Sequence, residues 1–414
     1  MEFLERIARE DERAVLACAP AAGLLHGEVN VIEQDFRWVR PLRFCDDQLR
    51  ALGSCQAWHP GLFRQMARTT AGISVEFETD GDNVALELRV DGEPKGTREV
   101  LKVMDRSQQD GALPHDGVSA SVDKRQLGCQ MPERDQSVVA WQLSGFDLED
   151  AMGLQHLPGM ARTRHVRIWL PALRGCMVRD VISDGSFVRS VPHRQNLLVL
   201  GDSIAQGFVS GDPACSWPSL LAQRLGLDLV NQGIGGQVFQ PGSLFGLAGI
   251  IDPARIVVAF GANYRYEPCM ARRVSLDIRS YLGEVSRLWP DVPTHVLTPI
   301  WHDEEAWPSH GMSCYKQVPD LIAAQVAIHE QMVLVDGLEL LDHDAKLLAD
   351  GYEHPNEAGC KQIANRINAV MRVPGLKPSS VGHRRKRKRK RKTTPAAAAA
   401  ESTSMLPIPF DENA

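Results

Sequence analysis

The sequence predicts an α/β fold with a parallel sheet in its second half, preceded by an antiparallel β-sandwich. From Ala71 onward, short runs alternate apolar and polar residues and are separated by Gly, Asp and Pro, which is typical of antiparallel strands. At Asn196 the pattern changes to continuous apolar runs, as expected of parallel strands covered on both faces. These runs alternate with helical segments, which indicates helices on both sides of the sheet. At 414 residues the chain is also too long for one hydrophobic core.

The predicted sandwich begins with a hairpin. Residues 73–77 and Val84–Val90 both have period two, and the turn residues TDGDN lie between them. We therefore expect two paired strands with one buried and one exposed face. Further strands are predicted at Glu99–Val103, Ser137–Leu143 and Val166–Leu170. The first 60 residues show no lasting period beyond a short helical pattern at 3–8.

The second half contains five predicted strands, Leu197–Leu200, Leu227–Val230, Ile256–Phe260, Thr294–Leu297 and Val333–Val335. A helix is expected near Ser216, because Pro218 would lie in its first turn and Gly226 just past its end. The helix with the clearest apolar face carries Ile278, Tyr281, Leu282, Val285, Leu288 and Trp289 and stops at Pro290. The last helix begins near Asn356 and ends before Pro374.

These patterns divide the chain into four parts: an N-terminal segment of uncertain structure (1–60), the sandwich (61–194), the α/β domain (195–375) and a basic tail (376–414). The tail has no core-forming pattern, so we expect it to be disordered. It holds ten Lys or Arg against three acidic residues, a charge of +7, which leaves −13 on residues 1–375. Its run Arg384–Lys392 either binds polyanions weakly and without specificity, docks on the acidic body, or is a solvated tail. No aromatic residues lie within the run to stack on bases.

Composition predicts a protein without a membrane span, because no apolar stretch approaches the length that a bilayer requires. The N-terminus alternates acidic and basic residues where a signal peptide has an apolar core, so we expect a cytoplasmic location. The nine cysteines are odd in number and form no C-x-x-C pair, which favours free thiols. Residues 301–305 and 342–344 are interpreted as solvated acidic loops rather than metal ligands. We expect no metal or organic cofactor, and the oligomeric state is not predicted.

Four short blocks follow one another in the α/β half: NLLVLGDS at 196–203, VNQGIGG at 230–236, RIVVAFGAN at 255–263 and DGYEHPN at 350–356. Ser203, Gly236 and Asn263 each follow a predicted strand, and ligands of open α/β sheets bind at the carboxyl ends of the strands. Ser203 would present its hydroxyl there. Gly236 would allow a backbone N–H to face an oxyanion, and the Asn263 amide is a second donor. Taken singly, each residue also fits a turn or a helix cap.

His354 supplies the base that a serine nucleophile requires. It precedes Pro355, so it lies in extended backbone rather than inside a helix. The loop comes after the last predicted strand and directly before the final helix. An imidazole there would take the serine proton during attack and return it to the leaving alcohol.

The four blocks resemble those of the SGNH (GDSL-type) hydrolases, over about residues 196–371. The resemblance implies a three-layer, flavodoxin-like domain in which Ser203 is the nucleophile and also donates its backbone N–H. It implies further that Gly236 and Asn263 complete the oxyanion hole and that His354 is the base. The β-rich half, about 71–190, resembles the jelly-roll-like domain that precedes the catalytic domain in some bacterial members, several of which are similar to carbohydrate acetyl esterases.

The chain departs from the family pattern around the base. The acid usually found three residues before the histidine is replaced by Gly351, and Asp350 lies four residues before it, with Glu353 next to the base. Either the loop bulges and Asp350 orients the imidazole, or a backbone carbonyl does so and the enzyme has a Ser–His dyad. Tyr264 also replaces the Asp that usually follows the asparagine. The block ending Ile204–Gly207 is interpreted as a variant of little chemical importance.

These residues predict a serine esterase that cleaves short-acyl esters, O-acetyl esters above all, of a small molecule or a carbohydrate. An acyltransferase would need the same residues. A different class of function is a glycan-binding protein whose hydrolase half is degenerate, a hypothesis motivated by the irregular loop before His354 and by Tyr264.

Overall fold

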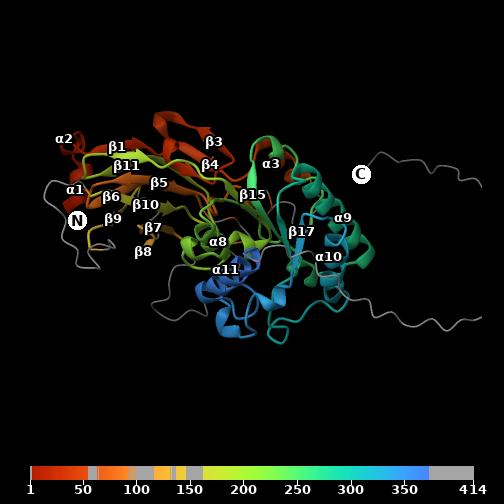
Figure 1. Ribbon diagram of the computed structural model, residues 1–414. Helices are drawn as coiled ribbons and strands as arrows, with labels where there is room; N and C mark the ends of the chain where they lie inside the picture. Colours follow the sequence, from red (N-terminus) through yellow and green to blue (C-terminus); the bar gives the residue numbers. More distant parts are fainter. Residues whose placement is uncertain are drawn as a thin grey trace, which may run out of the picture. The chain divides into compact units, whose positions relative to one another are not determined.

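The computed structural model describes residues 2–54, 63, 65–92, 94, 97, 116–130, 132, 137–145 and 162–372. Within them lie two antiparallel sheets, here called sheets A and B, and a parallel sheet C (Figure 1). The predicted strand at Glu99–Val103 and the basic tail from 376 lie outside the described residues, so neither prediction is tested.

Sheets A and B form the predicted sandwich. Sheet A has the order β3-β4-β11-β6-β9 with β1 beside β11, and sheet B has the order β12-β5-β10-β7-β8 with β2 beside β5. The bounds are β1 Ala17–Pro20, β2 Leu25–His26, β3 Asn30–Glu33, β4 Val39–Leu42, β5 Ser74–Thr79, β6 Asn83–Val90, β7 Val118–Val122, β8 Arg125–Gln130, β9 Val138–Gln142, β10 Arg164–Trp169, β11 Cys176–Ser183 and β12 Val188–Ser190. Leu86 and Val178 of sheet A share one hydrophobic core with Phe77 and Val166 of sheet B.

The predicted hairpin at 73–90 is wrong, because β5 belongs to sheet B and β6 to sheet A. Period two identified both strands correctly, but it carries no information about their partners. Arg164 of β10 fixes the turn between them, since its guanidinium donates to the Gly81 carbonyl at 2.6 Å and to Asp82 Oδ1 at 2.7 Å. The expected exposed face of β5 is also buried. Glu76, only 1% exposed, pairs there with Arg194.

The N-terminal segment, whose pattern was unclear, is part of the fold. It contains β1 to β4 and the helices α1 (Glu2–Ala8), α2 (Glu10–Arg13) and α3 (Asp46–Ser54). Arg43, directly after β4, is fully buried and donates hydrogen bonds to the carbonyls of Asn231 at 2.9 Å and Gly233 at 2.8 Å. The segment therefore contacts sheet C as well as completing the sandwich.

Sheet C is parallel throughout, as predicted, with the order β14-β13-β15-β16-β17. Its strands are β13 Asn196–Gly201, β14 Asp228–Gly233, β15 Pro253–Ala259, β16 Thr294–Leu297 and β17 Met332–Val335. The helices are α7 Ser203–Gln206, α8 Trp217–Leu225, α9 Ala271–Leu288, α10 Val318–Val326 and α11 Glu357–Met371. Short 3₁₀ turns occupy Ala21–Leu24, Asp35–Arg37, Pro213–Cys215, Leu247–Gly249, Ala262–Arg265, Tyr315–Gln317, Gly337–Glu339 and Ala345–Leu347.

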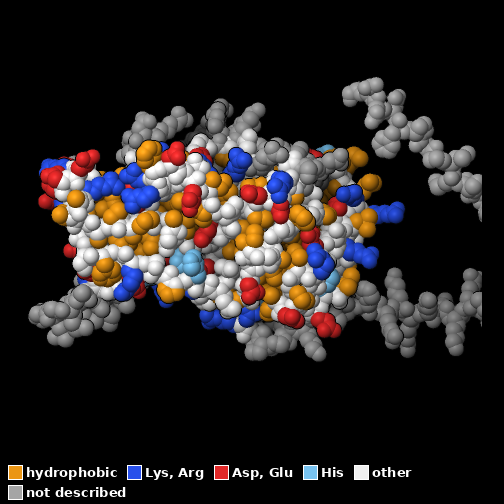
Figure 2. All heavy atoms as spheres, turned by 90° about the horizontal axis from the view of Figure 1, so that it is seen from above, with side chains coloured by type: hydrophobic (Ala, Val, Ile, Leu, Met, Phe, Trp, Pro, Cys, Tyr) orange, Lys and Arg blue, Asp and Glu red, His pale blue; other side chains and the backbone are white. Residues whose placement is uncertain are grey.

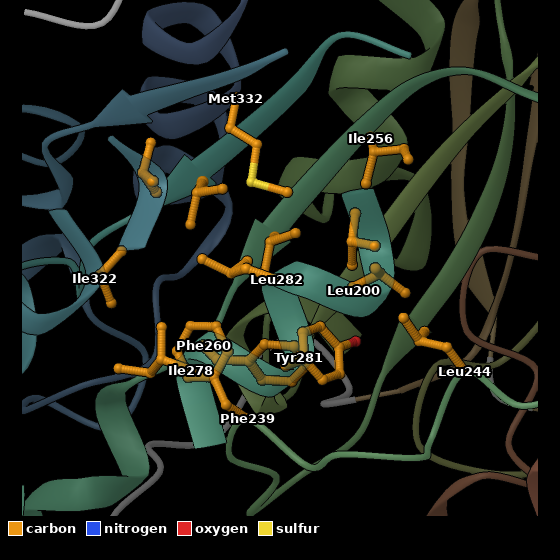
Figure 3. Packing of buried hydrophobic residues seen from close by; sticks show 14 of the residues in the cluster. Leu200, Phe239, Leu244, Ile256, Phe260, Ile278, Tyr281, Leu282, Ile322 and Met332 are labelled. Atoms are coloured by element: carbon orange, nitrogen blue, oxygen red, sulfur yellow. The ribbon is translucent and has the colours of Figure 1, made fainter. Parts of the chain in front are cut away.

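Helices cover both faces of sheet C, which confirms the three-layer prediction. Figure 1 shows α8 and α11 on one side and α9 and α10 on the other. Leu198 and Leu200 of β13 pack into the core under α9 and α10, whereas Leu197 and Val199 pack under α8 and α11. In the first of these cores Phe239, Phe260 and Tyr281 lie against one another, with ring centroids 5.2 to 5.8 Å apart (Figure 3).

The predicted helix ends are found where the sequence placed them. Ser216 caps α8, accepting a hydrogen bond from the Ser219 amide, and Gly226 ends the helix at a φ of 67°. Asn356 caps α11 in the same way by accepting from the Gly359 amide. These caps fix the loops that precede both helices, and the loop before α11 carries His354.

No helix among the described residues is long and apolar enough to cross a membrane. On the face that Figure 2 shows, acidic, basic and hydrophobic side chains are intermingled. Among the described residues, many charged side chains pair with one another, for example Arg179 with Glu87 and Arg189 with Glu78.

Candidate active site

Ser203 lies two residues beyond the end of β13 and is the first residue of α7. Asp202 caps this helix, its carboxylate accepting a hydrogen bond from the Ile204 amide at 3.1 Å. The chain therefore turns sharply from strand to helix at Ser203. The side chain lies at the carboxyl edge of sheet C, where the sequence placed it.

Ser203, His354 and Asp350 form a continuous chain of contacts. The Ser203 Oγ lies 2.8 Å from His354 Nε2, and His354 Nδ1 lies 2.6 Å from Asp350 Oδ2. Ser203 is 9% exposed and His354 8%, so both are shielded while a small part of each remains accessible. The ring of Phe208, 5.1 Å from the imidazole centroid, covers one side of His354.

The loop before α11 bulges so that Asp350 reaches the histidine from four residues away. Asp350 Oδ1 accepts hydrogen bonds from the backbone N–H groups of Tyr352, Glu353 and His354, at 2.9 to 3.0 Å. Gly351 makes the turn possible because its φ of 80° is strained for residues with a Cβ atom. Of the two arrangements left open above, the structure has the one in which Asp350 contacts the imidazole.

The site is strongly charged, and its pKa values are shifted accordingly. Burial alone would raise the pKa of Asp350, but the hydrogen bond and charge of His354, together with the backbone amides, lower it to about 2. Burial alone would lower the pKa of His354, yet the hydrogen bond that its ring donates to Asp350 and the negative charges of Asp350, Glu353 and Asp202 raise it. Burial and the charge of Glu353 raise the pKa of Asp202 to about 7. The environment thus favours the protonated imidazole, which is the form that His354 would have after taking the proton of Ser203.

Glu353, the extra acid beside the base, points away from Ser203 into a buried ion pair. Its Oε1 accepts from Arg265 Nε at 3.0 Å, and its Oε2 accepts from the Tyr266 hydroxyl. Arg265 is fully buried and also donates to the Trp307 carbonyl at 3.1 Å. The pair therefore ties the His354 loop to the segment that follows Asn263.

Gly236 and Asn263 lie on two neighbouring loops at the same edge of the sheet. Gly236 has a φ of 78°, which favours glycine, and Asn263 Nδ2 donates to the Gln237 carbonyl at 3.0 Å. This hydrogen bond links the loop after β14 to the loop after β15. Tyr264, which replaces the expected Asp, is buried with its ring in the core under α9, so it does not displace Asn263 from the edge.

Two further residues position these loops, and the sequence analysis missed both. Gln206 was treated as chemically unimportant, but its Oε1 accepts from the Gly235 N–H at 2.9 Å and its Nε2 donates to the Ala172 carbonyl at 3.0 Å. Asn231 donates to the Ala205 carbonyl at 2.9 Å. Residues 204–207 therefore have a structural part in holding the loop of Gly235, which the sequence did not indicate. The available signal was a long polar side chain, Gln206, in the short helical segment that begins at Ser203.

The two acidic loops are held by protein partners. His302 pairs with Glu304 at 2.7 Å, and Asp342 pairs with Arg366 and Gln362. Loop 301–307 also contacts the base loop, because the Asp303 amide donates to the Tyr352 carbonyl at 2.7 Å and the Trp307 ring stacks on Tyr352. This loop thus borders the site.

Comparison with known proteins agrees with this architecture. Residues 199–362 match the model of the GDSL-like lipase/acylhydrolase family. No curated protein matches the chain by sequence. Among solved structures, the chain is similar to the salicylyl-acyltransferase SsfX3 from a tetracycline biosynthetic pathway, at 15% identity and a TM-score of 0.66 over 87% of this chain and 99% of that one.

Two more structures have the same fold at low identity. A GDSL-like protein from Bacteroides ovatus has 16% identity and a TM-score of 0.63 over 86% of this chain and 97% of that one. The acetyl xylan esterase Est2A from Butyrivibrio proteoclasticus has 12% identity and a TM-score of 0.51 over 86% and 98%. The similarity spans the sandwich as well as the α/β half in each case.

The comparisons and the structure together define the architecture as a three-layer α/β domain that follows an N-terminal β-sandwich. Within this fold, residues 199–362 are similar to the GDSL-like lipase/acylhydrolase family, in agreement with the resemblance of the four sequence blocks.

Proposed function

We propose that the protein is a serine esterase that hydrolyses short-acyl esters through an acyl-enzyme on Ser203. The observation that carries this proposal is the contact chain from Ser203 through His354 to Asp350, with distances of 2.8 and 2.6 Å. The irregular loop that motivated a non-catalytic interpretation contributes Asp350 to this chain. The hypothesis of a glycan-binding protein with a degenerate hydrolase half therefore loses its main support.

In the proposed reaction, His354 Nε2 removes the proton of Ser203 as Oγ attacks the ester carbonyl carbon. The tetrahedral intermediate collapses, and His354 returns the proton to the departing alcohol oxygen. Water then attacks the acyl-enzyme with His354 again as base, releasing the acid and restoring Ser203. Asp350 keeps the imidazole oriented and stabilises its positive charge in each step.

The negative oxygen of the tetrahedral intermediate requires preorganised donors. We assign the backbone N–H groups of Ser203 and Gly236 and the side-chain amide of Asn263 to this role. Asn263 donates one of its two amide hydrogens to Gln237, and the second serves the oxyanion. The link to Gln237 fixes the amide before substrate binds, so little reorganisation is needed during reaction.

For the substrate we propose an O-acetyl or other short-acyl ester, on a small molecule or a carbohydrate. The similarity in fold to the acetyl xylan esterase Est2A supports a carbohydrate alcohol. The shielding of Ser203 and His354 supports a compact acyl group, because only a small part of either side chain is accessible.

Hydrolysis of 4-nitrophenyl acetate tests this function. Ser203→Ala should lower the turnover of this ester by a factor of about 10⁴ or more, because the nucleophile is lost. Ser219→Ala, which changes a buried serine of α8 outside the contact chain, is the matched control and should remain active. Equal turnover of Ser203→Ala and the parent would refute the assignment.

Acyl transfer to an alcohol other than water is the second candidate. It is favoured by the similarity to the salicylyl-acyltransferase SsfX3, which covers both halves of the chain. A transferase would partition the acyl-enzyme toward an added alcohol at millimolar concentration, whereas an esterase would release acid at an unchanged rate. Product analysis by mass spectrometry with a panel of sugars and phenols distinguishes the two.

A further inference from the structure

A second cluster of ligand-type side chains lies at the opposite end of sheet C from Ser203. Asp228 is the first residue of β14, His26 lies in β2 of the sandwich, and His193 precedes β13. Because β14 rises by about 3.3 Å per residue, Asp228 is roughly 16 Å from the loop that carries Gly236. The cluster is thus separate from the proposed esterase site.

The three side chains converge on one carboxylate oxygen. Asp228 Oδ2 lies 2.9 Å from His26 Nδ1 and 3.9 Å from His193 Nδ1. The imidazole centroids of His26 and His193 are 4.5 Å apart, with the rings tilted by 33°. One ligand atom from each residue falls within 4.8 Å of the others.

We propose that His26, His193 and Asp228 form a binding site for a divalent transition metal of the zinc type. Two imidazoles and a carboxylate are a donor set that Zn²⁺ takes in proteins. Ligand atoms about 2.0 Å from a tetrahedral zinc lie about 3.3 Å from one another, and the observed 2.9 and 3.9 Å lie on either side of that value. A small rotation of His193, which is exposed at 66%, brings the set to the required geometry.

Glu28 supplies an additional reason for a cation here. Its Oε2 is buried and lacks a hydrogen-bond partner, and its charge interacts with His193, His26 and Asp228. A buried carboxylate oxygen without a partner is costly, and a bound metal would compensate it. Glu28 is not among the residues whose ligand atoms lie within 4.8 Å of one another, so its carboxylate would favour the cation through its charge rather than as a ligand.

The balance of charges around the cluster is compatible with a bound divalent cation. Arg194 pairs with Asp228 Oδ1 at 2.6 Å and with Glu76, which also pairs with Arg167. Apart from the histidines, the cluster and its neighbours therefore hold three carboxylates (Asp228, Glu76 and Glu28) and two guanidinium groups (Arg194 and Arg167). Arg194 contacts Oδ1 through its side chain and donates its backbone N–H to Oδ2 at 2.8 Å, and the imidazoles approach Oδ2 as well. On metal binding through Nδ1, His26 would carry its one proton on Nε2.

Such a metal would join the sandwich to sheet C. His26 belongs to the sandwich, His193 to the connection between the two halves, and Asp228 to the parallel sheet. The ion would therefore be expected to stabilise the fold rather than take part in ester hydrolysis. Metal removal should lower the melting temperature and leave the rate of acetyl ester hydrolysis by folded protein unchanged.

The test uses the full chain, freed of metal with EDTA and titrated with Zn²⁺ by calorimetry and with Co²⁺ by visible absorption. The proposal expects one high-affinity Zn²⁺ per chain and the absorption bands of tetrahedral Co²⁺. His193→Ala should weaken Zn²⁺ binding at least 10-fold and abolish the rise in melting temperature on Zn²⁺ addition. His193 is exposed, so this variant should fold.

His329→Ala, which removes a histidine of the loop after α10, is the matched control and should bind Zn²⁺ as the parent does. A parent that binds no stoichiometric Zn²⁺ would overturn the proposal and leave a hydrogen-bonded structural cluster. Equal Zn²⁺ affinity of His193→Ala and the parent would overturn it too, since the ion would then bind elsewhere, for example at cysteine thiols.

Discussion

Asp350 binds His354 at two points: Oδ2 contacts the imidazole Nδ1 at 2.6 Å, and Oδ1 accepts from the His354 backbone N–H at 3.0 Å. The carboxylate therefore fixes both the ring and the chain that carries it. An acid placed four residues before the histidine can do this only because the loop bulges at Gly351. The geometry leads to several expectations about the reaction.

Asp350→Asn should lower kcat for acetyl ester hydrolysis by about 10² to 10⁴-fold, because the imidazole loses its orientation and its charge partner. His354→Ala should cause a loss at least as large. Asp320→Asn, which changes an exposed acid of α10, is the control and should leave kcat unaltered. A loss of less than about threefold in Asp350→Asn would show that the enzyme works as a Ser–His dyad.

The pH profile should report the state of His354. The imidazole must be neutral to act as a base, so kcat/KM should rise as the pH increases through its pKa. Burial favours a low pKa, but the charges of Asp350, Glu353 and Asp202 outweigh it and place the pKa above the ordinary 6.5. In Asp350→Asn the midpoint should move to lower pH, because a negative charge is lost. An unchanged midpoint would contradict the proposed coupling.

Arg265→Ala should destabilise the fold by about 3–5 kcal/mol, because it leaves the buried Glu353 carboxylate without its cation. Arg273→Ala is the comparison, since Arg273 also pairs with an acid, Asp277 at 3.0 Å, but is 73% exposed. That variant should lose less than about 1 kcal/mol. Urea denaturation gives both free energies of unfolding. Similar losses in the two variants would mean that burial of the Arg265–Glu353 pair has no energetic effect.

Gln206→Leu should reduce kcat by about 10- to 100-fold with a smaller change in KM, because the loop of Gly235 and Gly236 loses its side-chain anchor. Gln223→Leu, on the neighbouring helix α8, is the control for the loss of a glutamine and should leave kcat nearly unchanged. Steady-state kinetics with 4-nitrophenyl acetate separates kcat from KM. A change in KM alone would assign Gln206 to substrate binding instead of loop positioning.

The parallel sheet and its helices could be predicted because their signals are local. The apolar run before Ser203 and the caps Ser216 and Asn356 act within a few residues of themselves. The candidate site could also be predicted from local signals, because the carboxyl ends of parallel strands share one edge of the sheet. The contact between Asp350 and His354 could not be predicted, because it depends on the shape of the loop, and the spacing of the two residues leaves that shape open.

Long-range pairing could not be predicted. The alternation in β5 and β6 is the same whether the strands pair with each other or, as observed, lie in different sheets. Nothing in the sequence around Arg43 indicates burial, yet it lies among the backbone carbonyls of Asn231 and Gly233, 188 and 190 residues away. Such partners are set by tertiary packing. The cytoplasmic location and polyanion binding by Arg384–Lys392 remain predictions.

Labelling with a fluorophosphonate, followed by peptide mapping, tests the central claim most directly. The reagent reacts with serines that a neighbouring base has activated. The account predicts one adduct per chain, on Ser203, lost in Ser203→Ala and strongly slowed in His354→Ala. Folded protein that forms no adduct, or an adduct on another serine, would contradict the proposal that His354 activates Ser203.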